Sequence, residues 1–316
     1  INKLDLANSQ HNSFEFNGLS EFETVKISAY HNRGITDLLE KVLDDSKNIP
    51  SDLENIKLSI VGHPNVGKSS IFNLLTESNR SIVSEIPGTT RDSIDYLINY
   101  DDKTIKFIDT AGLRKRGQID PGIEKYSSIR SLKSIEMADV CILIINAEEM
   151  ITAQDLHISG FIKDLMRPCI IVLNKIDLLD KIESENLINR LKEKFSHIPD
   201  IPVILTSAKE VKNIDKIVPE AIKVYENSIK RINQKELNKC FLDALTKKQP
   251  PSKGNKTPEL FSISQYKVSP PGFKFESSNY DLIHFSYKRY LENNIRQNFD
   301  FAGCPISLKF VKGKKY

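Results

Sequence analysis

The chain has 316 residues, of which 39% are hydrophobic and 28% charged, a balance typical of a globular protein with a buried core. Its longest apolar runs are strand-length and far short of a membrane span, and at roughly 100–200 residues per domain the length predicts two or three domains. The four cysteines form no Cys-x-x-Cys pair, which argues against a zinc site or disulfide framework and favours a reducing, cytoplasmic location.

The net charge of +3 is unevenly spread. Residues 1–56 hold 5 basic and 10 acidic side chains, residues 57–231 hold 25 of each, and residues 232–316 hold 15 basic and 7 acidic, a net +8. A basic final quarter on a neutral body predicts a polyanionic partner for that end, although a solvated surface would show the same charge.

From residue 57, short apolar runs alternate with amphipathic stretches. Strands are expected at residues 57–61, 93–100, 103–109, 140–146, 169–174 and 203–207, and helices at 68–76, 127–137, 152–165, 183–196 and 213–231. This alternation predicts a mostly parallel sheet covered by helices on both faces, a three-layer α/β/α fold. Cys141 and Cys169 lie in apolar strands and are expected in the core.

The rhythm changes after residue 231. A helix at 236–245, strands at 260–268 and 273–278, a helix at 284–299 and a strand at 305–312 are expected. This α-β-β-α-β order within 85 residues predicts a small separate α+β domain.

The stretch GHPNVGKS, residues 62–69, matches the phosphate-loop pattern between a predicted strand and a predicted helix. Gly62 and Gly67 let the loop wrap so that its N–H groups face phosphate oxygens, and the helix N-terminus adds partial positive charge. Lys68 would reach the β- and γ-phosphates, and Ser69 would bind Mg²⁺.

Three further motifs follow predicted strands in order: DTAG at 109–112, NKID at 174–177 and TSAK at 206–209. Asp109 can hold Mg²⁺ directly or through water. Asp177 offers two acceptors to the N1–H and 2-amino group of guanine, donors that adenine lacks, so it selects GTP over ATP. The nucleotide-binding set predicted from these motifs is Gly62, His63, Pro64, Asn65, Val66, Gly67, Lys68, Ser69, Ser70, Asp109, Thr110, Ala111, Gly112, Leu113, Asn174, Lys175, Asp177, Ser207, Ala208 and Lys209.

Together these motifs resemble the translation-factor-related P-loop GTPases, and PGTTRD at 87–92 resembles their Era-like group. The resemblance implies that Thr90 is the switch I ligand of Mg²⁺ beside Ser69, and that Lys68, Thr90, Asp109 and Gly112 carry the catalysis. Leu113 stands where Ras-like enzymes have a water-orienting glutamine. Another element would therefore organise the attack on GTP.

Asn65 matches a loop asparagine that helps K⁺-dependent relatives hold a potassium ion against the phosphates. An ordinary turn asparagine is the alternative. Arg114, Lys115 and Arg116 lie in the expected switch II and could touch phosphate, meet RNA or form a solvated loop; the sequence does not choose between these.

Over nearly its whole length the chain resembles the Der (EngA) family, bacterial GTPases with two tandem G domains and a C-terminal KH-like domain. GHPNVGKSS, DTAGLRKRG and SYKRYLEN carry this resemblance. The opening INKLD followed by VKISA parallels LNKID followed by VILTSAK, but the first copy has no phosphate loop. Residues 1–50 are therefore interpreted as the end of a first G domain with a linker at 44–55, residues 56–231 as a second G domain, and residues 232–316 as a KH-like RNA-binding domain, with further G-domain sequence expected upstream.

The KH-like region has no Gly-x-x-Gly loop, which makes sequence-specific reading of single strands doubtful and favours phosphate contacts to folded RNA. Lys309, Lys312, Lys314 and Lys315 suit such contacts. Tyr287 and Tyr290 could stack on bases, but their helical spacing is more typical of core residues.

The leading prediction is a monomeric GTP-hydrolysing switch that binds ribosomal RNA and assists assembly of the large ribosomal subunit, as the resemblance implies. Two alternatives stay open. One is a nucleotide-gated RNA-binding module with incidental turnover, and the other is an ATP-using P-loop kinase, against which Asp177 argues.

Overall fold

A computed structural model describes residues 25, 27–28, 55–78, 85–87, 94–110, 132–196, 198–252 and 256–313 of the chain. The chain divides into two compact units, Ile1–Glu54 and Asn55–Tyr316. Of the first unit, Ser28 is buried and forms a β-bridge. The prediction that residues 1–50 repeat the end of a G domain therefore falls almost wholly outside the described residues.

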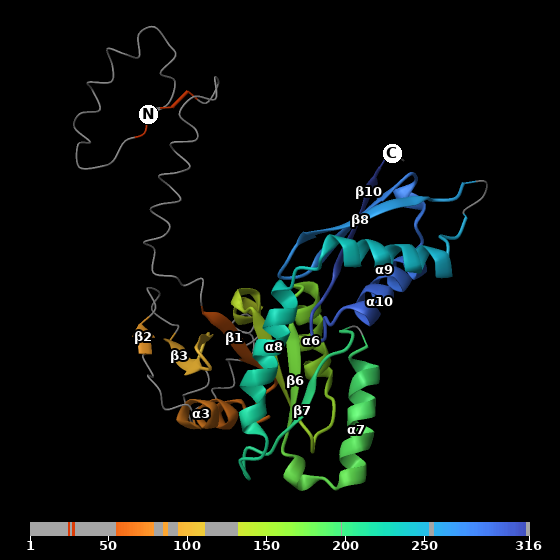
Figure 1. Ribbon diagram of the computed structural model, residues 1–316. Coiled ribbons are helices and arrows are strands. Elements are labelled where there is room, and N and C mark those ends of the chain that lie inside the picture. Colours follow the sequence, from red (N-terminus) through yellow and green to blue (C-terminus); the bar gives the residue numbers. More distant parts are fainter. Residues whose placement is uncertain are drawn as a thin grey trace. The chain divides into compact units, whose positions relative to one another are not determined.

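A seven-stranded sheet forms the centre of the second unit, in the order β2-β3-β4-β1-β5-β6-β7 (Figure 1). Strands β4, β1, β5, β6 and β7 are parallel, and β2 and β3 extend the sheet as antiparallel strands. The strands are β1 (Ile56–Val61), β2 (Glu85–Pro87), β3 (Ile94–Tyr100), β4 (Lys103–Phe107), β5 (Val140–Asn146), β6 (Cys169–Asn174) and β7 (Val203–Leu205).

Side chains of β5 alternate between two cores, one on each face of the sheet. Val140, Ile142 and Ile144 pack in one core, whereas Leu143 and Ile145 pack in the other. The first core includes α3 (Lys68–Ser78) and α8 (Ile217–Ile229), and the second includes α6 (Ala153–Asp164) and α7 (Lys181–Lys194). Two-sided burial explains why the strands read as continuous apolar runs, and it confirms the predicted three-layer fold.

Short 3₁₀ turns complete this part of the unit: η3 (Ile176–Leu178) follows β6, and η4 (Ile214–Lys216) leads into α8. Residues 132–137 of the predicted helix 127–137 are helical, and the rest of it lies outside the described residues. Cys141 and Cys169 are fully buried, and burial raises the pKa of the Cys141 thiol to about 12, so both are core residues as expected. No helix in the described part of the chain is long and apolar enough to cross a membrane.

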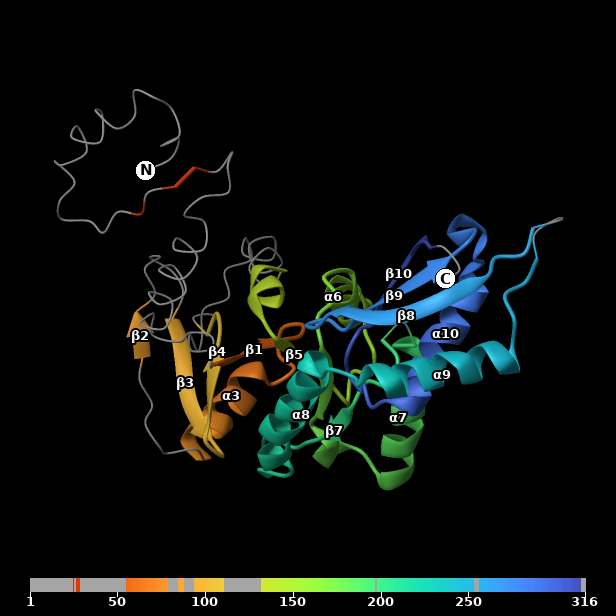
Figure 2. The same cartoon turned by 45° about the horizontal axis from the view of Figure 1, so that its top comes forward.

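The C-terminal elements follow the predicted α-β-β-α-β order. They are α9 (Gln234–Lys247), β8 (Leu260–Lys267), β9 (Gly272–Ser277), η5 (Tyr280–Leu282), α10 (Phe285–Asn298) and β10 (Ser307–Lys312). The three strands form a sheet in the order β10-β9-β8, with β10 parallel and β8 antiparallel to β9. Helices α9 and α10 lie together against this sheet (Figure 2).

The tyrosines of α10 were predicted either to stack on bases or to pack in the core, and both pack against α9. Tyr287 is 1% exposed, and its hydroxyl donates to the Lys248 carbonyl at 2.7 Å. Tyr290 is half-buried and donates to the Ala244 carbonyl at 2.8 Å. These hydroxyls tie α10 to α9, so base stacking by Tyr287 is not possible without unpacking the helix pair.

A loop of the C-terminal region is anchored on the large sheet. The Gly303 carbonyl accepts from the Cys169 N–H at 2.8 Å, at the start of β6, and the Gly303 N–H donates to the Asp200 carbonyl at 3.1 Å. The Cys304 thiol contacts the Val224 carbonyl on α8 at 3.2 Å. Gly303 has a φ of 72°, and a Cβ there would lie 2.8 Å from the Cys169 carbonyl oxygen, so only glycine fits this contact.

Candidate functional site

Five loops leave the sheet at one edge. They follow β1, β4, β5, β6 and β7, which are parallel, so their carboxyl ends meet there. Open α/β sheets bind their ligands at this edge. The predicted phosphate loop, DTAG, NKID and TSAK motifs all begin at it.

The phosphate loop fits tightly against its neighbours because its two glycines carry no side chain. A Cβ on Gly62 would lie 2.4 Å from the Ile144 carbonyl oxygen on β5. Gly67 has a φ of 101°, and a Cβ there would lie 2.2 Å from Asn174 Nδ2. Between them Val66 is fully buried, whereas Pro64 and Asn65 are exposed. The loop therefore packs against the core through Gly62, Val66 and Gly67, and its tip at Pro64 and Asn65 faces solvent.

Lys68 lies across the inside of the loop. Its Nζ donates to the Gly62 carbonyl at 2.9 Å and to the His63 carbonyl at 2.7 Å. Burial lowers the pKa of Lys68 to about 8, and the charge of Asp155 partly opposes this. Among the described residues the hydrogen-bond partners of this ammonium are neutral carbonyls, and a phosphate would add an anion in direct contact with it.

Helix α3 begins directly at the end of this loop, at Lys68. The Ile71 N–H donates to the Gly67 carbonyl at 3.0 Å, which begins the helix, and no acidic residue stands in its first turn. Ser69 is half-buried and Ser70 exposed in that turn. A helix of 11 residues that begins at a glycine loop has N–H groups and dipole arranged for an anion.

Asn174 joins three of the five loops. Its Nδ2 donates to the Val66 carbonyl at 2.9 Å, and its Oδ1 accepts from the Ala208 N–H at 3.0 Å. The side chain is buried, so both bonds are shielded from water. Asn174 thus fixes the phosphate loop and the TSAK loop against the NKID motif.

The carboxylate of Asp177 stands at the same edge. Ser207 Oγ donates to Asp177 Oδ1, and this hydrogen bond is the main cause that holds the pKa of Asp177 below its ordinary value. Lys175 and Lys209 add favourable charge. The Ser207 hydroxyl also accepts from the Glu210 N–H at 3.1 Å, so it is oriented toward Asp177. The arrangement presents an ionised, pre-positioned carboxylate to a ligand with two N–H donors.

Of the remaining predicted site residues, some are described by the structure and others lie outside the described residues. Asp109 follows β4 with a φ of 56°, and Thr110 beside it is buried. Thr90, Ala111, Gly112 and Leu113 lie outside the described residues, as do the basic residues at 114–116.

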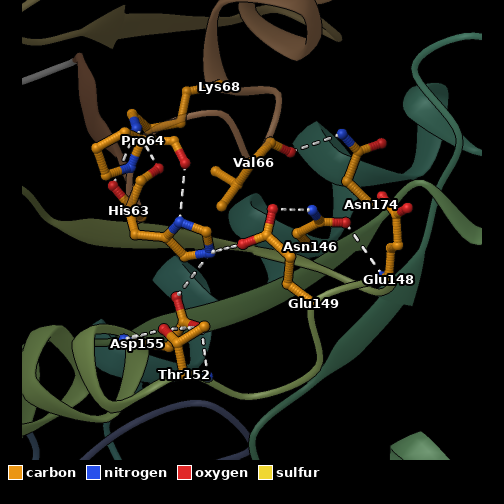
Figure 3. Close-up of polar contacts among 11 residues, drawn as sticks. His63, Pro64, Val66, Lys68, Asn146, Glu148, Glu149, Thr152, Asp155 and Asn174 are labelled. Carbon is orange, nitrogen blue, oxygen red and sulfur yellow. Dashed lines mark hydrogen bonds and ion pairs between the residues drawn. The ribbon is translucent and has the colours of Figure 1, made fainter.

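A polar cluster beneath the phosphate loop was not predicted (Figure 3). Its members come from the loop itself and from residues 146–155, which run from the last residue of β5 to the first turn of α6. Asp155 closes a capping box with Thr152 at the start of α6, and Asn146 Nδ2 donates to Glu149 Oε1 at 2.7 Å. The motif TAQD, residues 152–155, is a capping-box signature that the sequence displays. Its position under the loop depends on the topology.

Comparison with known proteins gives a family for each part of the second unit. Residues 57–175 match the family described as 50S ribosome-binding GTPase, and residues 231–310 match the KH-domain-like C-terminal family of EngA bacterial GTPase enzymes. Among solved structures, Era of Aquifex aeolicus bound to GDP and AlF₄⁻ is similar at 23% identity, with a TM-score of 0.42 over 80% of this chain and 91% of that one.

Curated relatives match nearly the whole chain. The GTPase Der of Finegoldia magna is 41% identical over 99% of this chain and 73% of its own length. The GTPase Der of Clostridium acetobutylicum is 40% identical over the same shares. The relatives thus also contain sequence that this chain does not span. From its glycine loop to its KH-like C-terminal sheet, the chain belongs to the Der (EngA) family of GTPases.

Proposed function

We propose that this GTPase uses the edge described above as its guanine-nucleotide site and acts as a switch in biogenesis of the large ribosomal subunit. The observation that carries the nucleotide assignment is the pair Asp177 and Ser207, an oriented carboxylate at the same end of the parallel strands as the phosphate loop. Guanine would give Asp177 its N1–H and 2-amino hydrogens, and adenine would leave the carboxylate unmatched. Exchange of Asp177 for asparagine should therefore lower the preference for GTP over ATP.

Hydrolysis would transfer the γ-phosphoryl group to water. Lys68 would leave the Gly62 and His63 carbonyls for the β- and γ-phosphates and stabilise the charge that develops in the transition state. We assign Thr90, Asp109 and Gly112 to catalysis with it.

A magnesium ion fits the donors at this edge. Mg²⁺ takes one or two protein ligands and completes its shell with phosphate oxygens and water, so a hydroxyl on the first turn of α3 and a nearby carboxylate suffice. Ser69 and Thr90 would bind it, and Asp109 would hold it directly or through water. The ion would neutralise phosphate charge during transfer.

We assign a potassium ion to Asn65. Its side chain is exposed at the mouth of the phosphate loop on a backbone with a φ of 65°, so an amide oxygen is available to a cation beside the phosphates. Hydrolysis in K⁺ and in Na⁺, for the wild type and for Asn65→Ala, tests this role. If K⁺ still stimulates hydrolysis by Asn65→Ala, Asn65 does not hold the potassium ion.

For the partner we propose folded ribosomal RNA. Supporting this are the net +8 of residues 232–316, the exposed Lys309 and Lys312 on β10, and the description of the matched family as ribosome-binding. Lysines contact phosphates without reading sequence, so binding should weaken steeply with salt. The domain limits 56–231 and 232–316, a first G domain ending in residues 1–50, a monomeric state and a cytoplasmic location remain predictions.

A nucleotide-gated RNA-binding module with incidental turnover is the alternative. GTP turnover should be measured with and without large-subunit particles. Strong stimulation by the particles supports a hydrolytic cycle, whereas slow turnover that the particles leave unchanged, together with GTP-dependent particle binding, supports the module.

A further inference from the structure

The imidazole of His63 lies beneath the phosphate loop and is 6% exposed (Figure 3). Its Nδ1 is 2.8 Å from the Pro64 carbonyl oxygen. A carbonyl can only accept, so Nδ1 carries a proton and donates. This bond fixes the ring to its own loop and turns Nε2 away from the loop, toward the segment between β5 and α6.

Nε2 faces two carboxylates. It lies 3.6 Å from Glu149 Oε2 and 3.9 Å from Asp155 Oδ1. Neither His63 Nε2 nor Asp155 Oδ1 has a hydrogen-bond partner among the described residues, although both atoms are buried. The other oxygen of Asp155 accepts from the Thr152 N–H at 3.0 Å and from the Thr152 hydroxyl at 2.8 Å, so the carboxylate is held rigidly on α6.

The burial of the two carboxylates decides which one matters more. The Glu149 side chain is 47% exposed and accepts from Asn146, so water screens an ion pair between it and His63. Asp155 is 0% exposed, so its oxygen that is unpaired among the described residues cannot be satisfied by bulk water and gains most from a donor. Its Oδ1 lies 3.9 Å from Nε2, about 1 Å longer than a hydrogen bond.

The ring is connected to Lys68 through the backbone. The carbonyl that accepts from Lys68 Nζ at 2.7 Å belongs to His63 itself. Asp155 also acts on Lys68 through its charge. We propose that His63 is a positioning residue that carries a proton on each ring nitrogen. Its Nδ1–H holds the Pro64 carbonyl and its Nε2–H docks on Asp155 Oδ1, which together set the loop backbone from which Lys68 reaches the phosphates.

This inference rests on the proposed nucleotide site. It assigns no contact between His63 and the nucleotide, and it predicts that a distant carboxylate on α6 sets phosphate affinity. The residues are 92 positions apart, so the coupling is a property of the fold.

Two substitutions of His63 distinguish its contact with Asp155 from its packing within the loop. In His63→Asn the amide nitrogen can replace Nδ1 and keep the bond to Pro64, but nothing reaches Asp155. In His63→Gln the longer amide can place a donor where Nε2 stands. We expect GDP affinity to fall about tenfold in H63N, the size of one hydrogen bond to a buried charge, and H63Q to recover most of that loss.

The partner is tested with Asp155→Asn in a double-mutant cycle. D155N alone should weaken GDP binding about as much as H63N, and the double variant should be little worse than either, because the two residues act through one contact. The matched control is Glu183→Gln, since Glu183 closes the same kind of capping box with Asp180 at the start of α7. E183Q should bind GDP as the wild type does.

The readouts are GDP affinity by calorimetry, with KM and kcat for GTP and the thermal midpoint of each nucleotide-free variant. Loss of affinity in H63N and D155N at an unchanged midpoint, non-additive and recovered in H63Q, supports the inference. Equal loss in H63N and H63Q, additive effects, or wild-type affinity in H63N overturns it. If the wild type itself binds no GDP, the proposed nucleotide site has failed instead.

Discussion

Asn174 Nδ2 donates to the carbonyl oxygen of Val66 at 2.9 Å and so binds the end of β6 to the phosphate loop. The two residues are 108 positions apart in sequence. The same amide accepts from the Ala208 N–H at 3.0 Å. One side chain therefore aligns the loop expected to hold phosphate with two loops expected to hold the base, and GTP can be bound at both ends only while this alignment holds.

Asn174→Asp should weaken GDP binding at least tenfold. The aspartate keeps an oxygen for the Ala208 N–H but loses the donor to Val66 and places a negative oxygen against a buried carbonyl, at a cost of about 1–3 kcal/mol. Calorimetric titration with GDP measures the change. Asn298→Asp is the matched control, because Asn298 Nδ2 donates to the Asn294 carbonyl at 2.8 Å on α10. Wild-type GDP affinity in N174D would show that the hydrogen bond from Asn174 to the Val66 carbonyl is not needed for binding.

Ser207→Ala should reduce both GDP affinity and selectivity for guanine. The Ser207 hydroxyl is the main cause that holds the pKa of Asp177 below its ordinary value and it orients the carboxylate, so its loss should weaken GDP binding several-fold, on the order of one hydrogen bond. Competition by GDP and ADP for a fluorescent guanine nucleotide gives both quantities. Ser262→Ala offers a comparison, since Ser262 Oγ donates to Glu276 Oε2 at 3.0 Å in the C-terminal sheet. Equal behaviour of S207A and S262A would contradict the role given to Ser207.

The stability of the nucleotide-free protein should rise with pH above about 8 because of Lys68. Its folded pKa of about 8 lies below the ordinary 10.5, so the unfolded chain binds more protons between those values and the folded state gains as the proton is lost. Below pH 8 the whole penalty, about 3 kcal/mol, is present. Denaturant unfolding at pH 7 and pH 9.5 measures the slope, and Lys68→Met should abolish this contribution. If stability rises with pH equally in K68M, a group other than Lys68 causes the pH dependence.

Gly303→Ala should loosen the attachment of the C-terminal region while leaving the nucleotide edge intact. The added Cβ would lie 2.8 Å from both the Cys169 carbonyl oxygen and Val224 Cγ2, on a backbone with a φ of 72°. Strain of this kind costs about 1–3 kcal/mol. Limited proteolysis after residue 229 should accelerate, and GDP affinity should change less than twofold. Gly160→Ala is the control, because its Cβ meets no heavy atom within 4 Å.

The sequence predicted most of the strands and helices of the second unit because their signals are local. Apolar runs such as residues 140–146 and the glycine loop at 62–67 need no tertiary information. The strand β2 was missed, since three residues, Glu85–Pro87, carry no periodicity. Helix α9 begins two positions before the prediction, because the Asn233 side chain caps it by accepting from the Lys235 N–H.

The contacts that organise the candidate site could not be predicted in the same way. Val66 meets Asn174, and His63 faces Asp155, only because parallel strands bring distant loops to one edge. Motifs identified Asn174 and Lys68 as site residues, but their hydrogen bonds within the protein follow from the packing of the loops. Gly303 gave no sequence signal at all, since its requirement comes from the close approach of Cys169 and Val224.

Selection of guanine by Asp177 and hydrolysis of GTP at this edge of the sheet can be tested in one experiment. The most direct measurement is release of phosphate from γ-labelled GTP by the wild type in the presence of Mg²⁺, with unlabelled ATP or GTP as competitor. We expect unlabelled GTP to suppress the release at concentrations near KM, and ATP at a hundredfold excess to leave it nearly unchanged. Equal suppression by ATP and GTP would show that Asp177 does not select guanine at this site.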